Sequence, residues 1–333
     1  MPDISKINAL DIGSVSKVDG LAKASILDID GVAVPSGLAP AAAYSVRLLG
    51  SGVGISSYTG PAMRVRRDTA GGTGDDDEAD IAFDSGVISL DSAISNASAG
   101  VTATTLGQFL NVGTVGGTTY TNPDSLSGTA SCFVDEWKDQ SGNANHASQA
   151  TFGSQPQIHS GTVNTDLITE NGKPAVDFDG SNDRLVFSNT GLDIGSLSSC
   201  TVGKFNSTSQ TAGMMQLSGS SSNKRWYAPF EFSATYRFGY VTTLTINGGT
   251  SDTSQHLFTM MAGSTLGNAS AWVDGAFKNS ATLDSGISNI ALIGDADGTY
   301  ADCLVQELVV WGADQSSNRT GIESDIMTYF SIP

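Results

Sequence analysis

The side chains of Pro174-Ala175-Val176-Asp177-Phe178-Asp179 alternate between apolar and polar, and this alternation is the clearest indication of the fold class. A period of two residues puts the apolar side chains on one face of a strand, as in a half-buried β-strand. The turn-forming stretch Gly180-Ser181-Asn182-Asp183 follows, and the apolar run Leu185-Val186-Phe187 comes shortly after it. The pattern therefore predicts two strands joined by a polar turn.

Short strand patterns of this kind continue to the end of the chain. Each is rich in apolar or β-branched residues and is bounded by turn formers, which predicts a meander of antiparallel strands. The predicted strands span residues 257–262, 270–273, 290–293 and 303–311. After them, Asp314 is predicted to cap a single C-terminal helix. The apolar stripe of that helix consists of Ile322, Ile326, Tyr329 and Phe330.

The composition favours an all-β chain with one main core. The chain has 333 residues, 39 of them glycine, and only 15% of its residues are charged. Such values are typical of many short strands joined by polar turns. Three widely spaced cysteines, Cys132, Cys200 and Cys303, are predicted to be free and buried, because a chain of this length needs no disulfide to fold.

The formal net charge of -18 argues against nucleic-acid binding, because phosphates would be repelled. No apolar stretch approaches the roughly 20 residues that span a bilayer, so we expect no membrane insertion. The N-terminus lacks the apolar core of a signal peptide, and we expect the chain to leave the cell within an assembled particle. No nucleotide motif and no metal-ligand spacing is present, which predicts no cofactor and no metal.

The first 36 residues repeat at an 11-residue step. Each unit is a short β-branched run closed by a turn of the Asn or Asp-Gly type, which predicts one strand and one reversal. Strands this short bury too little apolar surface to stand alone, so we predict docking on another copy or on a particle scaffold. A flexible solvated arm is the alternative. The predicted anchor residues are Ile4, Ile7, Val15, Val18, Ile26 and Ile29. Turn formers then place a boundary between a 1–36 module and a 37–333 domain.

Several blocks after this boundary carry a family pattern. They are AAAYSVRLL at 41–49, YTGPAMRVRR at 58–67, WKDQSGNANHA at 137–147, NGKPA at 171–175 and QELVVW at 306–311. The first three, in this order, resemble the arabinofuranosidase B catalytic domain. The last two are similar to the wider group of concanavalin A-like, LamG-type domains. The resemblance covers roughly residues 39–333 and implies a concanavalin A-like β-sandwich, that is, a two-sheet jelly roll.

The resemblance also implies two catalytic carboxylates. Enzymes of this family are retaining hydrolases, in which a nucleophile and an acid/base lie only about 5 to 5.5 Å apart. Glu231, in Pro229-Phe230-Glu231-Phe232, stands where the nucleophile is expected, and Asp295, in Ile293-Gly294-Asp295-Ala296, stands where the acid/base is expected. Neighbouring polar residues of the family pattern are absent at both places. Glu231 fits equally well as an outward-pointing residue of an edge strand.

Sugar contacts are predicted from two groups of residues. Trp226, Tyr227 and Arg237 lie close in sequence, and aromatic rings of this kind stack on sugar faces, although they also fill cores. Asp139 and Gln140 belong to the family block and either contact a sugar or hold a tight loop. The acidic loop at 71–78 is either a solvated insertion or a holder of a hard cation.

Taken together, the patterns lead to one interpretation and one alternative. The interpretation is a phage virion structural protein, either a capsid decoration, a fibre or a tail-associated protein, that displays a lectin-like jelly roll at the virion surface. Its expected partners are other copies of itself, other virion proteins, and host or environmental glycans. The alternative is an active retaining glycoside hydrolase with Glu231 and Asp295 as its catalytic pair.

Overall fold

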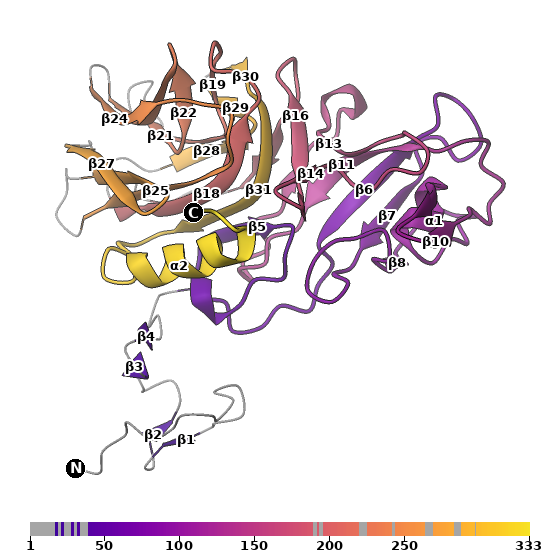
Figure 1. Ribbon diagram of the computed structural model, residues 1–333, viewed down its shortest axis with the longest axis horizontal. Coiled ribbons are helices and arrows are strands. Elements are labelled where there is room, and N and C mark those ends of the chain that lie inside the picture. Colours follow the sequence, from indigo (N-terminus) through magenta and orange to yellow (C-terminus); the bar gives the residue numbers. More distant parts are fainter. Residues whose placement is uncertain are drawn as a thin grey trace.

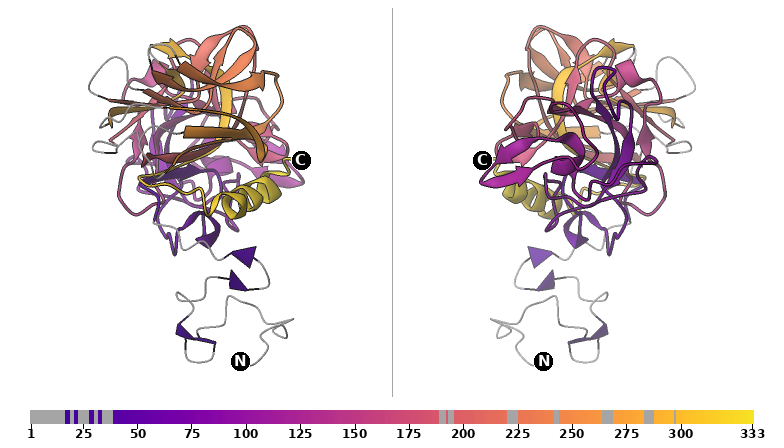
Figure 2. Two further views of the ribbon diagram at one scale, coloured as in Figure 1. Left: turned by 90° about the vertical axis from the view of Figure 1, so that its left-hand side faces the viewer. Right: turned by 90° about the vertical axis from the view of Figure 1, so that its right-hand side faces the viewer.

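The computed structural model describes residues 39–188, 192, 196–219, 225–241, 244–263, 269–282, 288–296 and 298–333. It also describes the backbone of four two-residue strands near the N-terminus, which form two hairpins (Figures 1 and 2). Apolar side chains from Ala42 to Ile332 gather in one buried core. The chain is therefore built mainly of antiparallel strands around a single core, as the sequence predicts.

The first layer of the sandwich is organised around β31 (Asp302–Trp311). One edge of β31 pairs with β18 (Ser198–Phe205), and the other pairs with β5 (Ala42–Ser45) and β16 (Val176–Asp179). Beyond β18 follow β25 (His256–Ala262), β26 (Ala269–Val273) and β27 (Ala276–Ala281), all antiparallel. Nine of the ten residues of β31 are buried, which explains why its sequence is apolar except at Asp302, Gln306 and Glu307.

The second layer packs against the first. Its strands, in spatial order, are β12 (Ala147–Ser148), β17 (Leu185–Phe187), β28 (Ser288–Ile293), β20 (Met215–Gly219), β21 (Arg225–Tyr227), β23 (Thr235–Val241) and β24 (Leu244–Thr250). The ribbon β22 (Phe230–Phe232) and β19 (Thr211–Gly213) extends from β23. The indole N–H of buried Trp226 donates to Ser199 Oγ across the layers at 2.8 Å, so polar as well as apolar contacts join the two sheets.

A third group of strands forms the right-hand lobe of Figure 1. Its order is β13 (Gln157–Ser160), β11 (Ser131–Trp137), β6 (Met63–Asp68), β7 (Glu78–Ile81) and β8 (Ile94–Ser95). The short helix α1 (Leu106–Leu110) and the hairpin of β9 (Gly113–Val115) and β10 (Thr118–Tyr120) lie on this lobe. Because β13 also pairs with β16 at Gln157 and Asp177, the lobe is joined directly to the first layer.

The terminal helix α2 (Arg319–Phe330) lies where the sequence predicts it, but its start differs. Asn318, not Asp314, is the residue that precedes the first turn. Asp314 instead accepts a hydrogen bond from the Ser316 backbone N–H at 2.9 Å, which closes a local turn before the helix. Ile322, Ile326 and Phe330 are buried, so the predicted apolar stripe does pack on the sandwich. The helix α1 has no counterpart in the sequence prediction, because five residues are too few to show a helical period.

Cys132, Cys200 and Cys303 are buried and free, as predicted. In the part of the chain that the structure describes, no helix is both long and apolar enough to cross a membrane.

Two of the N-terminal repeats form hairpins. Val18 pairs with Leu21, between β1 (Lys17–Val18) and β2 (Leu21–Ala22), and Ile29 pairs with Val32, between β3 (Asp28–Ile29) and β4 (Val32–Ala33). Within the described residues these strands pair only with each other. The predicted anchor residues Ile4, Ile7, Val15 and Ile26 lie outside the described residues. Their docking role stays a prediction.

Gly294 offers a test of how tightly the core packs beneath β29 (Asp295–Ala296). Its φ of 79° favours glycine, and a Cβ there would meet Phe178 Cδ1 at 2.1 Å. Gly298 has a φ of 77° but open space around its Cβ position, so it is a matched control. We expect Gly298→Ala to lower the free energy of unfolding by about 1 kcal/mol, from backbone strain alone. Gly294→Ala should lower it by about 2 kcal/mol more, through overpacking, as measured by urea denaturation. Equal losses would contradict the tight packing.

Candidate functional site

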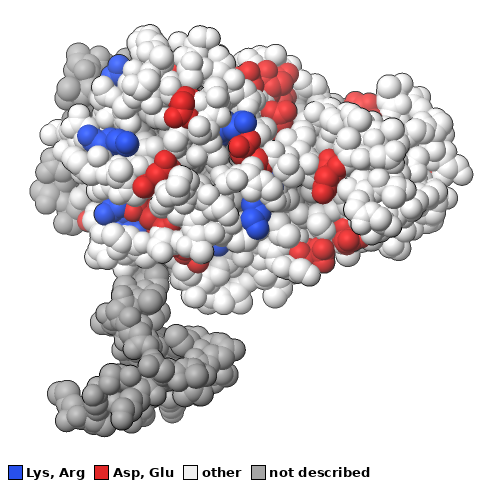
Figure 3. Space-filling model, in the orientation of Figure 1, with Lys and Arg blue, Asp and Glu red and all other residues white. Residues whose placement is uncertain are grey.

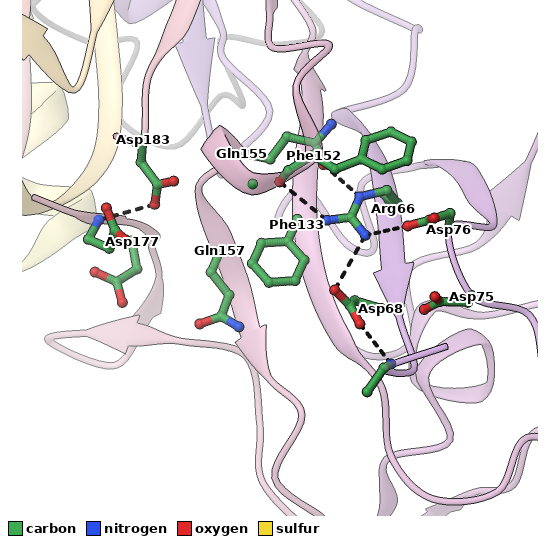
Figure 4. A pocket seen from close by; sticks show the side chains of 13 residues that line it. Arg66, Asp68, Asp75, Asp76, Phe133, Phe152, Gln155, Gln157, Asp177 and Asp183 are labelled. Carbon is green, nitrogen blue, oxygen red and sulfur yellow. Dashed lines mark hydrogen bonds and ion pairs between the residues drawn. The ribbon is translucent and has the colours of Figure 1, made fainter. Parts of the chain in front are cut away.

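A groove lies where the lobe meets the first layer of the sandwich. Its volume is about 650 Å³. One wall comes from the end of β6 and the loop after it, and the other from β16 and the turn that follows (Figure 4). The residues that line it are Arg66, Asp68, Ala70, Asp75, Asp76, Phe133, Phe152, Gly153, Gln155, Gln157, Asp177, Asp179 and Asp183. Polar acceptors and aromatic rings thus face the same space.

Arg66 supports the first wall. Its guanidinium lies 4.9 Å from the Phe133 ring centre and 4.6 Å from that of Phe152, so it fills the space between the two rings. Its Nε donates to Gln155 Oε1 and its Nη1 to Asp76 Oδ1, both at 2.8 Å. Only 3% of the side chain is exposed, whereas Phe152 is 44% exposed. The buried cation therefore holds an accessible aromatic ring in place.

The acidic loop at 71–78 is held by specific contacts rather than being a freely solvated insertion. Asp77 pairs with Arg67 at 2.6 Å, and Asp76 pairs with Arg66. Asp75 accepts hydrogen bonds from the backbone N–H groups of Thr69 and Gly71. The bond from Thr69 lowers the pKa of Asp75, so this carboxylate is charged at neutral pH. The loop thereby forms a fixed edge of the groove.

The opposite wall presents carboxylates with little counter-charge. Asp183 is 7% exposed, and its Oδ2 accepts a hydrogen bond from the Asp179 backbone N–H at 3.1 Å. Burial, with a smaller effect of Asp179 and Asp177, raises the pKa of Asp183 to about 7. Burial likewise raises the pKa of Asp177, and the nearby Asp302 adds to the effect. Among the described residues no group of His, Cys, Asp and Glu side chains is placed to hold a metal ion.

The two predicted catalytic carboxylates lie outside this groove. Glu231 is fully buried on β22, where Ser251 Oγ donates to its Oε1 at 3.2 Å. Its Oε2 makes no hydrogen bond within the described part of the chain, and burial raises the pKa of the group. Asp295, on β29, is 1% exposed and accepts from Arg184 Nη1 at 3.3 Å and from the Gly298 N–H at 2.9 Å. Glu231 is therefore no outward-pointing edge residue.

The strand β19 contacts both β22, which carries Glu231, and β29, which carries Asp295. It pairs with β22, with Ala212 opposite Glu231. On the same strand, a Cβ at Gly213 would lie 2.7 Å from Ala296 Cβ and 3.2 Å from the Phe230 ring. The absence of a side chain at Gly213 thus lets β29 pack directly on β19. Phe230 and Ala296, which meet at this contact, are the chain neighbours of Glu231 and Asp295.

The residues predicted to contact a sugar are buried or lie outside the groove. Trp226 and Tyr227 are 0% and 3% exposed, which leaves no ring face for a sugar to stack on. Arg237 is partly buried on β23 and does not line the groove. Asp139 accepts from the N–H groups of Ala43 and Ser141, and Gln140 bonds Leu49 and Arg47 backbone atoms. Asp139 and Gln140 therefore hold a tight loop, which is the second of the two roles that the sequence left open for them.

The groove residues were not predicted as a site. They come from segments far apart in the sequence, from β6 to the turn after β16, and no single motif contains them. Two signals were nevertheless present in the sequence. The polar members of the stretch 174–179, Asp177 and Asp179, must share one face of the strand, and the aspartate run at 75–77 lies in a loop after a basic strand.

Comparison with solved structures agrees with the fold. Two structures of a GH54 α-L-arabinofuranosidase are similar: one was soaked with a cyclic sulfate inhibitor (12% identity, TM-score 0.52), and the other is a mutant soaked with 4-nitrophenyl α-L-arabinofuranoside (13% identity, TM-score 0.53). Both matches cover 86% of this chain and 62% of the arabinofuranosidase chain. A Trypanosoma rangeli sialidase matches 57% of this chain and 30% of its own length, with 11% identity and a TM-score of 0.41.

The two arabinofuranosidase structures agree with the fold of this chain. The chain is a β-sandwich of the jelly-roll type also found in glycoside hydrolases, and it spans about three fifths of the length of the arabinofuranosidase chain. No protein-family model and no curated protein matches the sequence. At this level of identity the structural similarity concerns the fold alone.

The raised pKa of Asp183 predicts a measurable pH dependence. In the unfolded chain this carboxyl ionises near its ordinary pKa of about 3.9, whereas in the folded chain it ionises at about 7. The folded state therefore loses stability as the pH rises from 4 to 7, because only the unfolded chain releases the proton. We expect Asp183→Asn to be more stable than the native chain at pH 8, with the difference shrinking toward pH 4, as measured by urea denaturation. A difference that does not change with pH would contradict the shift.

Proposed function

We propose that this chain is a structural protein of a phage particle that binds glycans through the groove. In this proposal the 37–333 sandwich carries the groove outward, and the 1–36 repeats attach the chain to the particle. The observation that carries the glycan-binding part is the placement of the exposed Phe152 ring beside several carboxylate and amide groups. Apolar faces of sugars stack on such rings, while their hydroxyl groups bond to such acceptors.

The groove has the size and rigidity that this function needs. Its volume of about 650 Å³ falls within the range of small-molecule sites. The Phe152 ring is backed by Arg66, whose donors are already used by Gln155 and Asp76. Gln155 itself donates to Asp135 Oδ1 at 3.0 Å and to the Gln149 carbonyl at 2.8 Å. A wall held in this way needs little ordering when a ligand binds, and this favours affinity.

The display part of the proposal is supported by the repeats and by the charge. The hairpins β1–β2 and β3–β4 are too short to be stable alone and pair with no strand of the sandwich among the described residues. A partner surface, such as other copies of the chain or other virion proteins, would satisfy their edges. Acidic side chains are spread over the face of the body shown in Figure 3. The net charge of -18 suits a protein crowded at high copy number on a virion surface.

Removal of the Phe152 ring tests the glycan-binding part. We expect Phe152→Ala to weaken binding of a glycan found by array screening by about tenfold, because a stacking face of roughly 1.4 kcal/mol is lost. Phe277 is also an exposed phenylalanine, at 58%, but it lies on β27 away from the groove. Phe277→Ala should bind as the native chain does. Titration calorimetry would measure both, and equal affinities in the two variants would reject the groove as the site.

Deletion of residues 1–36 tests the anchor. We expect the truncated chain to keep the melting temperature of the full chain, because the described core begins at Ala42. It should no longer be incorporated into particles when it is expressed during infection, as measured by mass spectrometry of purified virions. Normal incorporation of the truncated chain would contradict the anchor proposal.

An active retaining glycoside hydrolase is the second candidate, and the surroundings of Glu231 favour it. A buried carboxylate with a hydrogen-bonded Oε1 and an unpaired Oε2 is costly for stability, and such groups concentrate at functional sites. The packing of β29 on β19 sets Ala296, the chain neighbour of Asp295, against the strand that pairs with Glu231. This candidate uses the carboxylates, whereas the first uses the groove, so the two can be separated by mutation.

The hydrolase candidate predicts release of 4-nitrophenol from 4-nitrophenyl α-L-arabinofuranoside. Glu231→Gln should abolish that release. Glu323 is a matched control, because it too is a buried glutamate with a raised pKa and an unpaired oxygen, but it lies on α2. Glu323→Gln should keep full activity. Absence of release by the native chain, or equal loss in both variants, would speak against Glu231 as a nucleophile.

A further inference from the structure

The charges of the groove are unevenly compensated, and this bears on what it binds. Six aspartates and one arginine line it among the described residues. The arginine is Arg66, which is buried, and its ion pairs are made with Asp68 and Asp76 on its own wall. No cationic side chain is therefore available to receive a carboxylate, sulfate or phosphate group of a ligand. An acidic glycan would meet repulsion on both walls.

The opposite wall has no cationic partner within the described part of the chain. Asp177, Asp179 and Asp183 form no ion pair there, and Arg184, the residue after Asp183, is turned toward Asp295 at 3.3 Å. Asp183 is 7% exposed and uses only one carboxylate oxygen, in its bond from the Asp179 N–H. Its second oxygen accepts no hydrogen bond from a described residue, although the residue lines the groove. An acceptor that faces the groove without a donor from the described residues can receive a donor that arrives with the ligand.

A bound metal ion does not fit as the missing partner. The carboxylates of the groove do not converge on one point in the described residues, where no group of three ligating side chains is formed. They are instead spread along the two walls, as Figure 4 shows for Asp75, Asp177 and Asp183. Cationic groups spaced along an extended ligand match that distribution better than a single ion does.

We propose that the groove selects glycans that carry free, protonated amino groups, and that Asp183 and Asp177 receive those groups. This inference rests on the proposed glycan-binding function and names its ligand class. An ammonium group donates up to three hydrogen bonds and carries one positive charge. It therefore supplies a donor for the second Asp183 oxygen and a counter-charge for the aspartates of this wall. N-acetylation of the same sugar removes the charge and should remove the preference.

Matched oligosaccharides test the inference on the full chain. Titration calorimetry at pH 7, where a large share of the Asp183 carboxyls is ionised, would compare a glucosamine tetramer, the N-acetylglucosamine tetramer and a galacturonate tetramer. We expect the amine-bearing tetramer to bind about tenfold more tightly than its acetylated form, because hydrogen bonds between charged groups are stronger than neutral ones. The galacturonate tetramer should show no binding. Asp183→Asn should reduce the preference for the amine to about threefold or less.

Controls separate this inference from the general acidity of the chain and from the proposed function. Asp166 is exposed and does not line the groove, so Asp166→Asn should keep the preference. A preference that survives Asp183→Asn and Asp177→Asn, or that falls equally with Asp166→Asn, would overturn the inference. Binding of the acetylated tetramer as tightly as the amine, with loss in Phe152→Ala, would overturn the inference and leave the proposed function standing. If no glycan binds at all, both the inference and the proposed glycan-binding function are overturned.

Discussion

The buried ion pair between Arg47 and Glu307 links the central strand β31 to β5 and α2. Glu307 is fully buried on the central strand β31, and it accepts from Arg47 Nε at 2.8 Å, Arg47 Nη2 at 3.1 Å and Ser45 Oγ at 2.8 Å. Arg47 also pairs with Asp325 of α2 at 2.8 Å and lies 4.7 Å from the Tyr329 ring centre. A charge buried in a core is costly unless it is fully paired, so β31, β5 and α2 must be placed together for any of them to be stable.

The position of the groove follows from the same strand. β31 pairs with β16, which sets Asp177 opposite Leu304 and Asp179 opposite Asp302. The other edge of β16 pairs with β13 and so joins the lobe, whose strands β6 and β11 carry Arg66 and Phe133. The two walls of the groove are therefore fixed relative to each other through backbone pairing. A groove defined in this way keeps its shape when surface side chains vary, which suits binding by a preformed site.

The strands could be predicted from the sequence, whereas the groove could not. Strands such as β16, β25 and β31 have one-dimensional signals, because alternation or an apolar run reports burial directly. The start of α2 was predicted at Asp314 rather than at Asn318, since an aspartate can accept from a helix N–H or, as Asp314 does, from the N–H of a turn. The groove depends on β6 and β16 lying near each other across the lobe, and no local pattern encodes that pairing. Trp226 was predicted to contact a sugar but is buried, because a cluster of aromatic residues in the sequence does not show which ring is exposed.

Glu231 and Asp183, two carboxylates with raised pKa values, also differ in what their surroundings allow. Glu231 is closed off from solvent, and its Oε1 is held by Ser251. Asp183 lines an open groove, where a ligand can reach it without any change in the sandwich. Binding at the groove and chemistry near β19 therefore place independent demands on the fold. A sandwich organised around β31 can lose or keep either one, since neither site takes part in the contacts of Arg47 and Glu307 that join β31 to β5 and α2.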